Sequence, residues 1–337
     1  MLNVIFVAYD KNSSGIASYT LELAKLISET FNVSIISFDS LFGIKGANII
    51  TVPRPPFPSY FPLLNARASN NLISSAIRDV SPDIVHETLP PLAWNVKNLV
   101  TTQWGYVGYL RLAMIRTHQM QFPYNVGGIP VTFQHWLGDK KSFKSAKRII
   151  CISKMNENFM PPPIGIRPLK KDTEDDELKL LFVARDINIA RKNLSVLLNA
   201  VKFLRKKFIL HIVGKGHAKS EHTVFHGPLG NSEVIRLMNE CDALVLPSLY
   251  EELGYVGLEA YSVGLPVIAS DIPSFKIVFR KSLFFSPTNH IALARLLESV
   301  STEELRNLGI ESRRFAIQTR EYVRDRLQQI YESIITH

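Results

Sequence analysis

The chain has 337 residues, which is too long for one ordinary domain and suits two domains of about 150 residues each. Hydrophobic residues make up 46% of the chain and aromatic residues 10%, so it holds enough apolar material for two buried cores. No apolar run approaches the roughly 20 residues that a membrane-spanning helix needs, which argues against an integral membrane protein.

The basic charge balance has more than one explanation. The chain has 39 Lys and Arg residues against 30 Asp and Glu residues, a net charge of +9. This charge fits a solvated basic surface, or attraction to anionic lipid headgroups or to a lipid-phosphate acceptor. A nucleic-acid partner is not expected, because the sequence contains none of the familiar recognition modules.

The start of the chain and its cysteines indicate an intracellular protein. Residues 1–9 have no basic segment or small-residue cleavage site, so we expect a first strand and not a signal peptide. Cys151 and Cys241 lie in or beside apolar runs and are expected to be reduced core residues. The expected location is the cytoplasm, with peripheral binding to the inner face of an anionic membrane as an open alternative.

In the first half, short apolar runs alternate with helical patterns, which is typical of parallel sheets covered by helices. A helix is expected over Ile16–Glu29, because its apolar residues recur on one face. The expected strands are Asn3–Ala8, Val33–Phe38, Asn48–Val52, Asp83–His86, Leu99–Thr102 and Arg148–Ile152. Between them, the Pro- and aromatic-rich residues 53–62 fit a packed connector, or a loop that inserts into a membrane surface.

Three consecutive prolines in residues 160–168, followed by a charged stretch, predict a break and a linker. The second half then repeats the alternation. Its expected strands are Lys179–Ala184, Ile209–Val213, Thr223–Phe225, Ala243–Leu246, Val267–Ala269 and Ser282–Phe285, with helices at Leu194–Phe203, Ser232–Asn239, Tyr255–Val263 and after Thr302. We therefore expect an α/β protein of two Rossmann-like domains that face each other across a cleft: residues 1–167 with a C-terminal helix 318–337, and residues 168–317.

The most specific stretch is Pro247–Ser270, which runs from the end of a strand through a loop into a helix. Glu251 lies in the loop and Glu259 on the helix, whose start at Gly254 offers free N–H groups and a positive dipole end to a diphosphate. The two carboxylates could accept hydrogen bonds from the hydroxyls of a sugar and a ribose. Taken alone, they also fit a surface glutamate and a glutamate favoured by the helix dipole.

This stretch resembles the signature of glycosyltransferase family 4, a group of retaining transferases with the GT-B fold. The matching residues are Pro-Ser at 247–248, Leu-Glu-Ala at 258–260, Gly-Leu-Pro-Val at 264–267 and Ala-Ser at 269–270. The resemblance implies that Glu251 contacts the transferred sugar and Glu259 the nucleotide ribose. It also places Gly254, Tyr255 and Val256 at the donor.

Two further motifs follow the order of the same family. Residues 181–194 are similar to its strand ending in arginine and its lysine loop, which implies that Arg185 and Lys192 clamp the donor diphosphate. Two cations at the end of a strand would also stabilise the phosphate as it departs. Residues 210–216 are similar to the family's Val-Gly-x-Gly turn, which implies that Gly214 and Gly216 lie near the nucleotide.

The first half matches the family more loosely. Gly15 falls in a segment that resembles the first glycine loop, where the backbone approaches the donor phosphate. His86 ends another similar segment, and it is assigned to the acceptor side together with Trp104. Gln103 stands where many members have a histidine near the reacting sugar, and glutamine cannot exchange protons near neutral pH.

Two more residues depart from the signature, Glu252 in place of a glycine and Lys276 in place of a common glutamate. The sequence has no Asp-x-Asp motif, and the resemblance implies no metal ion and no cofactor beyond a nucleoside diphosphate sugar as donor substrate. The expected function is a retaining hexosyltransferase that acts on a glycan or lipid-linked acceptor in polysaccharide, glycolipid or glycan-precursor synthesis. The substitution at Gln103 leaves a non-catalytic sugar-nucleotide-binding subunit as the alternative, and a sugar-nucleotide epimerase shares the fold.

Overall fold

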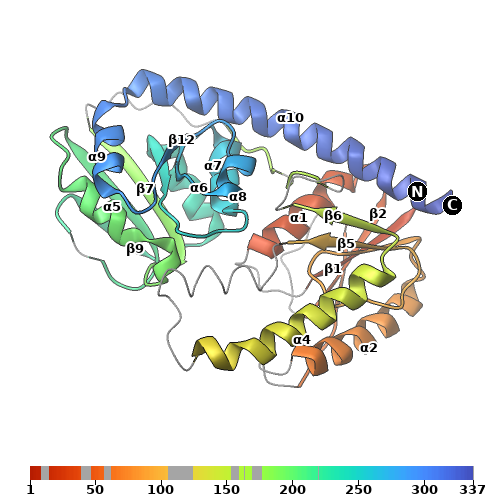
Figure 1. The fold of residues 1–337 in the computed structure, drawn as a ribbon. Helices are drawn as coiled ribbons and strands as arrows, with labels where there is room; N and C mark the ends of the chain where they lie inside the picture. The colour runs from red at the N-terminus through yellow and green to blue at the C-terminus, as the bar shows by residue number, and fades with distance from the viewer. Residues whose placement is uncertain are drawn as a thin grey trace. The chain divides into compact units, whose positions relative to one another are not determined.

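The computed structural model describes residues 1–8, 15–38, 47–56, 62–104, 124–152, 159–162, 164–168, 177–218 and 220–336. The chain divides into two compact units. Unit 1 comprises Met1–Pro163 and Arg320–His337, and unit 2 comprises Ile164–Thr319. Figure 1 labels most of the helices and several strands of both units.

Within its described residues, unit 1 contains one six-stranded parallel sheet in the order β3-β2-β1-β4-β5-β6. The strands are β1 (Asn3–Ala8), β2 (Asn32–Ser37), β3 (Asn48–Thr51), β4 (Ile84–Glu87), β5 (Leu99–Gln103) and β6 (Arg148–Cys151). The central strands β1 and β4 are buried along nearly their whole length, as expected for a parallel sheet with both faces covered. This order is the one found in Rossmann-type nucleotide-binding domains.

Helices cover both faces of this sheet. Helix α1 (Gly15–Ile27) and the last turns of α10 (Thr302–Ile335) lie on one face, where Tyr19 and Tyr331 are buried. Helices α2 (Pro62–Val80) and α4 (Tyr124–Ser145) pack against each other on the opposite face. There, Ile73 of α2 joins a core with Ile5, Val85 and Leu99.

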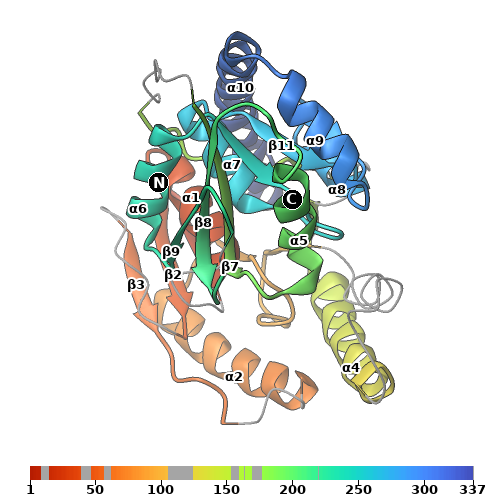
Figure 2. The same cartoon turned by 90° about the vertical axis from the view of Figure 1, so that its left-hand side faces the viewer.

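Unit 2 repeats the arrangement. In the residues described, its sheet is also six-stranded and parallel, in the order β12-β11-β10-β7-β8-β9. The strands are β7 (Leu178–Asp186), β8 (Phe208–Lys215), β9 (Thr223–Gly227), β10 (Ala243–Leu246), β11 (Val267–Ser270) and β12 (Leu283–Phe285). Figure 2 shows β7, β8 and β9 lying side by side.

The helices of unit 2 are α5 (Leu194–Val201), α6 (Asn231–Glu240), α7 (Tyr255–Val263), α8 (Pro273–Val278), α9 (His290–Ser299) and the first part of α10. Leu197 of α5 and Leu293 of α9 meet Leu180 and Val245 of the sheet in an apolar core. Helix α10 has Glu303 and Glu304 in its first turn, where the positive end of the helix dipole stabilises their negative charges.

The expected α/β architecture with two Rossmann-like domains is confirmed. Every expected strand and helix is present, with ends that differ by one to three residues in most cases. Of the Pro-rich loop at 53–62, residues 57–61 lie outside the described residues, as do residues 169–176 of the linker. No helix within the described ranges combines the length and apolarity needed to cross a membrane.

Candidate functional site

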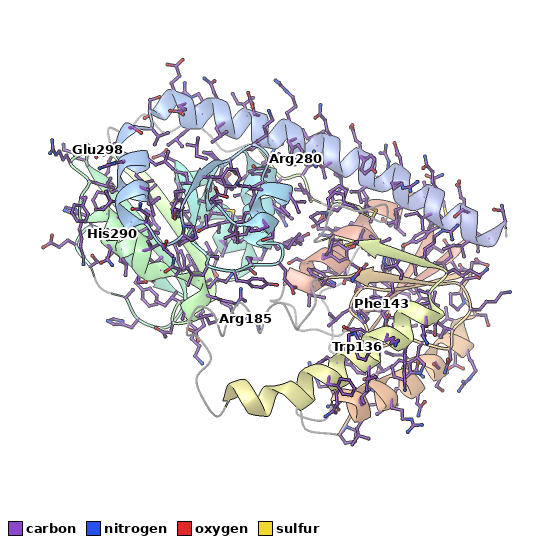
Figure 3. All side chains as sticks on the ribbon, in the orientation of Figure 1. Trp136, Phe143, Arg185, Arg280, His290 and Glu298 are labelled. Carbon is purple, nitrogen blue, oxygen red and sulfur yellow. The ribbon has the colours of Figure 1, made fainter. Side chains whose placement is uncertain are left out.

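The predicted donor residues of unit 2 gather at the carboxyl edge of its sheet. Arg185 lies near the end of β7, Gly214 near the end of β8, and Glu251 in the loop after β10. Because all strands of this sheet are parallel, these ends meet at the same edge, where open α/β sheets bind their ligands. Arg185 is exposed there, and Figure 3 shows it with its side chain.

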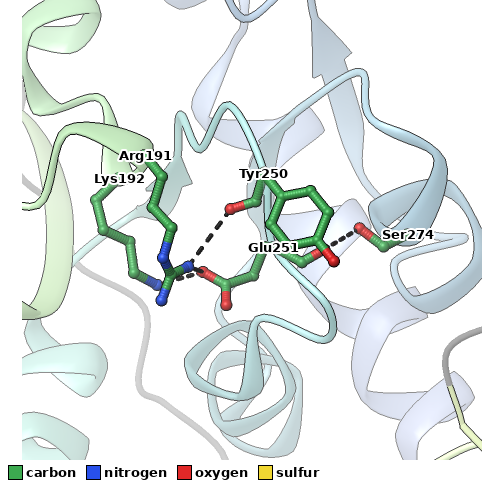
Figure 4. A network of polar contacts seen from close by, with 5 residues as sticks. All are labelled: Arg191, Lys192, Tyr250, Glu251 and Ser274. Atoms are coloured by element: carbon green, nitrogen blue, oxygen red, sulfur yellow. Dashed lines mark hydrogen bonds and ion pairs between the residues drawn. The ribbon is translucent and has the colours of Figure 1, made fainter. Parts of the chain in front are cut away.

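Glu251 is the centre of a network of polar contacts, drawn in Figure 4. Its Oε2 atom accepts a hydrogen bond of 2.9 Å from the Arg191 guanidinium and another from the Lys192 Nζ atom. The Arg191 guanidinium also donates to the Tyr250 carbonyl at 3.4 Å, and the Ser274 hydroxyl donates to the Glu251 carbonyl. The structure therefore brings together Glu251 and Lys192, which belong to two separate sequence motifs and lie 59 residues apart in the chain.

Asn193 fixes the loop that carries the two cations. It follows a short 3-10 helix, Ala190–Lys192, and adopts a left-handed conformation with φ 57°. Its side-chain amide donates to the carbonyls of Pro247 and Pro287, at 2.9 and 2.8 Å. The Leu249 N–H donates to the Arg191 carbonyl at 2.8 Å. These bonds hold Arg191 and Lys192 beside the Glu251 loop, so the charge pairing is built into the backbone and does not rest on long side chains alone.

Gly214 and Gly216 let the turn after β8 lie against the end of β7. Both have positive φ values, 146° and 128°, which disfavour residues with a side chain. A Cβ atom at Gly214 would meet the Ala184 carbonyl oxygen at 2.2 Å, and one at Gly216 would meet the Ile187 Cγ1 atom at 2.6 Å. The two glycines therefore allow close approach to the segment that carries Arg185.

Helix α7 starts beside this network. Gly254 is its N-cap in the left-handed conformation, φ 65°, and a Cβ atom there would lie 2.7 Å from the Phe275 ring. Tyr255 and Val256 form the first turn of the helix, and both are half-buried. Glu259 follows one turn later, and its Oε1 atom accepts a hydrogen bond of 2.8 Å from the Asn231 amide at the start of α6. The start of α7 thus has Glu251 before it and Glu259 after it.

Tyr250 stays protonated next to these charges. Burial raises the pKa of its phenol to about 12, and the carboxylates of Glu252 and Glu251 raise it in the same direction. A neutral phenol can donate a hydrogen bond without adding a negative charge to the loop. Lys276, which stands where the resembled family commonly has a glutamate, forms an exposed ion pair of 2.7 Å with Asp271.

The predicted residues of unit 1 also lie near one edge of their sheet. Gly15 starts α1, and Gln103 ends β5, half-buried, with its carbonyl accepting a hydrogen bond from the Ile152 N–H. Trp104 donates from Nε1 to the Thr88 carbonyl at 2.7 Å, and its ring meets Tyr19 edge-on. These residues belong to unit 1, whereas Glu251 belongs to unit 2.

His86 does not share the exposure of that edge. It is fully buried, and its ring nitrogens form hydrogen bonds with the Tyr331 hydroxyl at 2.6 Å and the Thr102 hydroxyl at 2.9 Å. Burial lowers the pKa of the imidazole to about 3, so it is neutral. Both ring nitrogens of His86 are therefore satisfied inside the core, which leaves neither of them for an acceptor.

Sequence reasoning missed three residues of the unit 2 site. Arg191 directly precedes Lys192, and only the lysine was assigned to the donor from this motif. The second cation beside it could have been recognised as a further candidate. Asn193 and Asn231 gave no comparable signal. Their roles depend on a left-handed turn and on the approach of α6 to α7, neither of which appears in a sequence pattern.

Comparisons with known proteins agree with this architecture. Residues 177–303 match the family model described as glycosyl transferases group 1. A 41.2 kDa protein in the cps region of Klebsiella pneumoniae is 28% identical over 149 residues, 42% of this chain and 37% of that protein. A glycosyltransferase of Methanocaldococcus jannaschii is 27% identical over 199 residues, 52% of this chain and 56% of that protein. The chain thus matches these relatives over less than two thirds of their length.

Solved structures match over the full chain. Sucrose-phosphate synthase of Thermosynechococcus elongatus superposes with a TM-score of 0.76 at 14% identity, and 100% of each chain is covered. The Anabaena protein HepE in complex with UDP-glucose superposes with a TM-score of 0.69 at 13% identity, again with 100% of each chain covered. The chain therefore has the GT-B fold, and residues 177–303, which lie in its second unit, match the glycosyl transferases group 1 model.

Proposed function

We propose that this protein is a retaining hexosyltransferase that moves a sugar from a nucleoside diphosphate sugar to a hydroxyl group of a glycan or lipid-linked acceptor. The observation that carries the proposal is the carboxylate of Glu251 held between Arg191 and Lys192, beside the start of α7. A carboxylate to bind sugar hydroxyls and cations to bind phosphate are the two chemistries that such a donor requires.

Each donor part has a proposed partner in unit 2. The diphosphate would lie against the Arg185 and Lys192 cations and the N–H groups at the start of α7. Glu259 would accept hydrogen bonds from the ribose, with the Asn231 amide fixing its orientation. Glu251 would accept hydrogen bonds from the transferred sugar. A related fold, HepE, is solved with UDP-glucose, which supports a donor of this class.

The proposed chemistry needs no enzymic nucleophile. The bond between the anomeric carbon and the phosphate oxygen breaks while the acceptor oxygen attacks from the same face, and the departing phosphate takes the proton of the acceptor. Lys192 and Arg185 stabilise the negative charge that develops on the phosphate. We propose that these cations and the helix dipole fill the role of a metal ion. Gly15, Gln103 and Trp104 of unit 1 are proposed for the phosphate and acceptor sides.

Glycan, glycolipid or polysaccharide synthesis at the cytoplasmic face of a membrane would suit this activity. The net charge of +9 leads us to propose peripheral contact with an anionic membrane, where a lipid-linked acceptor would lie.

A donor panel tests the proposal directly. UDP-, GDP-, ADP- and TDP-linked sugars are compared by thermal shift, because a ligand that binds only the folded state raises its apparent stability. The donor that shifts the wild type is then assayed for transfer and for the anomeric configuration of the product. Loss of the shift in Lys192→Ala but not in the exposed Lys202→Ala supports the site. No shift by any donor, or a product of inverted configuration, would contradict the proposal.

The second candidate is a subunit that binds a sugar nucleotide without transferring the sugar, and Gln103 is the residue that favours it. The two functions differ in one experiment. Donor binding that is unaffected by any acceptor, with no sugar transferred or released in a long incubation, identifies the binding subunit. A new sugar nucleotide formed from the donor alone would instead identify an epimerase.

A further inference from the structure

Helix α4 of unit 1 presents an aromatic and cationic stripe to solvent. Phe133 and Trp136 expose 56% and 45% of their surface, although both are large apolar residues. Their rings stack with centroids 5.6 Å apart. Lys140 and Lys144 follow along the same helix, both exposed. The spacing of three, four and four residues places all of them on one face of the helix, which we call the α4 stripe.

The opposite face of α4 fixes the direction of this stripe. Gly138 packs so closely against Pro91 that a Cβ atom on Gly138 would lie 2.5 Å from the proline ring. Ser142 is fully buried, and its hydroxyl donates to the Glu87 carboxylate at 3.2 Å. Gly138 and Ser142 are four residues apart and face the sheet, so the α4 stripe points away from it. Figure 3 labels Trp136 and Phe143 on this helix.

The charges on and around the stripe are basic. Beside Lys140 and Lys144, the exposed Lys141, Lys147 and Arg148 continue the positive charge toward β6. The Lys140 Nζ atom lies 4.8 Å from the centroid of the Trp136 ring. In the described part of the helix, the one carboxylate is Asp139, which lies on the side of Glu87. The stripe therefore combines apolar rings with positive charge and has no acid among its own residues.

We propose that the α4 stripe docks unit 1 on an anionic lipid surface. Tryptophan favours the headgroup level of a bilayer, where its ring is amphipathic, and lysine extends its ammonium group to lipid phosphates. Each lysine near such a surface adds attraction, and apolar side chains that enter the acyl boundary add the rest. The stripe has both components on one helix face that the fold turns outward. The inference rests on the membrane contact proposed above and not on the transfer reaction.

Vesicle binding by the full chain tests this assignment. Wild-type protein is sedimented with vesicles of phosphatidylcholine, and with vesicles of equal parts phosphatidylcholine and phosphatidylglycerol. Binding is expected only to the anionic vesicles and should fall steeply with added NaCl. The fluorescence of Trp136 should shift to the blue on binding, because this ring then leaves water.

Two pairs of variants separate the components of the stripe, each with a matched control on unit 2. Phe133→Ser with Trp136→Ser is compared with Phe203→Ser, which also removes an exposed aromatic ring. Lys140→Glu with Lys144→Glu is compared with Lys202→Glu and Lys207→Glu, which change the net charge equally. Each stripe pair should weaken binding by about tenfold or more, and each control by much less.

Folding is checked independently by the melting temperature. Trp136→Phe keeps an aromatic ring at this position but leaves only the fluorescence of Trp94 and Trp104, so the blue shift should be lost in this variant. Equal binding by stripe and control variants overturns the α4 assignment but leaves a membrane contact elsewhere. No binding of the wild type to anionic vesicles overturns both. A change from dimer to monomer in the stripe variants, without vesicle binding, would assign the stripe to a second copy of the chain.

Discussion

His86 and Tyr331 lie 245 residues apart in the sequence and share a buried hydrogen bond of 2.6 Å between Nδ1 and the phenol oxygen. His86 belongs to β4 and Tyr331 to the last turns of α10. Burial holds the imidazole neutral and raises the pKa of the Tyr331 phenol. The pair ties the C-terminal part of α10 to the central strands of unit 1.

Tyr331→Phe should destabilise unit 1 without affecting donor binding by unit 2. The substitution leaves the Nδ1 atom of His86 buried without its partner, which costs about 1–3 kcal/mol. Thermal and urea unfolding measure the loss. Tyr322→Phe on the same helix is the control, because that ring is 51% exposed. Equal stability of the two variants would show that the hydrogen bond contributes nothing.

Lys192→Ala should reduce transfer by about 10²–10³-fold, the typical effect of losing one preorganised group that stabilises developing charge. Its loss also removes one of two cations from Glu251, so Arg191→Ala is measured beside it. We expect Arg191→Ala to have the smaller effect, because Lys192 keeps the carboxylate paired. The measurement is the ratio kcat/KM for donor. Unchanged turnover in Lys192→Ala would remove its assignment to the diphosphate.

Substitution of Glu251 and of Glu259 should have different effects on nucleotide affinity and on sugar transfer. Glu251→Gln should leave nucleoside diphosphate affinity nearly unchanged while transfer collapses, because its proposed partner is the sugar. Glu259→Gln should weaken nucleoside diphosphate binding by about 1–3 kcal/mol, the cost of an impaired hydrogen bond to a charged group. Calorimetric titration with the nucleotide alone distinguishes them. Equal losses of nucleotide affinity in both variants would contradict the division of roles.

Gly214→Ala should destabilise unit 2 far more than Gly227→Ala. Both glycines have positive φ values, 146° and 68°, so both variants carry backbone strain of about 1–2 kcal/mol. A Cβ atom at Gly214 also meets the Ala184 carbonyl oxygen at 2.2 Å, whereas one at Gly227 meets nothing within 4 Å. Denaturant unfolding reports the difference. Equal destabilisation would mean that the turn after β8 relaxes without cost.

Glu87 should make unit 1 less stable as the pH rises. Burial raises the pKa of its carboxyl to about 7, although four hydrogen bonds from Thr101, Ala93, Leu92 and Ser142 lower it. The folded state thus keeps a proton that the unfolded chain releases near its ordinary value of 4.5, so stability falls as pH rises between these values. Asp139 follows the same direction, with its pKa raised to about 7 by burial and by Glu87.

Glu87→Gln isolates this contribution, because the variant has no carboxyl to ionise. Relative to wild type, it should gain on the order of 2 kcal/mol in stability between about pH 5 and about pH 8. The exposed Glu321→Gln should show no such gain. A difference between Glu87→Gln and wild type that stays constant with pH would mean that Glu87 is ionised throughout.

The strands could be predicted from the sequence because each is a short apolar run between polar turns. Helices α2 and α4 were not predicted. The α2 segment is rich in Asn and Ser, which favour turns and caps, and the α4 segment contains Gly127, Gly128 and Pro130. Packing of α2 and α4 against each other and the sheet outweighs these weak local preferences.

Two of the residues predicted for the site, Lys192 and Glu251, are in contact in the structure, while their roles stay predictions. Whether a predicted site residue is exposed to solvent was harder to infer from the sequence. His86 lies one residue before the end of β4, and successive strand residues point to opposite faces of the sheet. The sequence around His86 does not reveal that Tyr331, 245 residues further along the chain, covers the sheet face on which His86 lies. The partners of Glu251 and Glu259 likewise depend on loops whose conformation is fixed by Asn193 and the start of α6.

The division of α10 between the two units has a consequence for synthesis on the ribosome. All of unit 2 is translated before Arg320, where the second segment of unit 1 begins. Domains commonly fold in the order in which they emerge, N-terminal first. Helix α1 can cover part of the sheet face that carries His86, but the part that Tyr331 covers stays open until the end of α10 has been made. We therefore expect unit 2 to be able to complete its fold before unit 1.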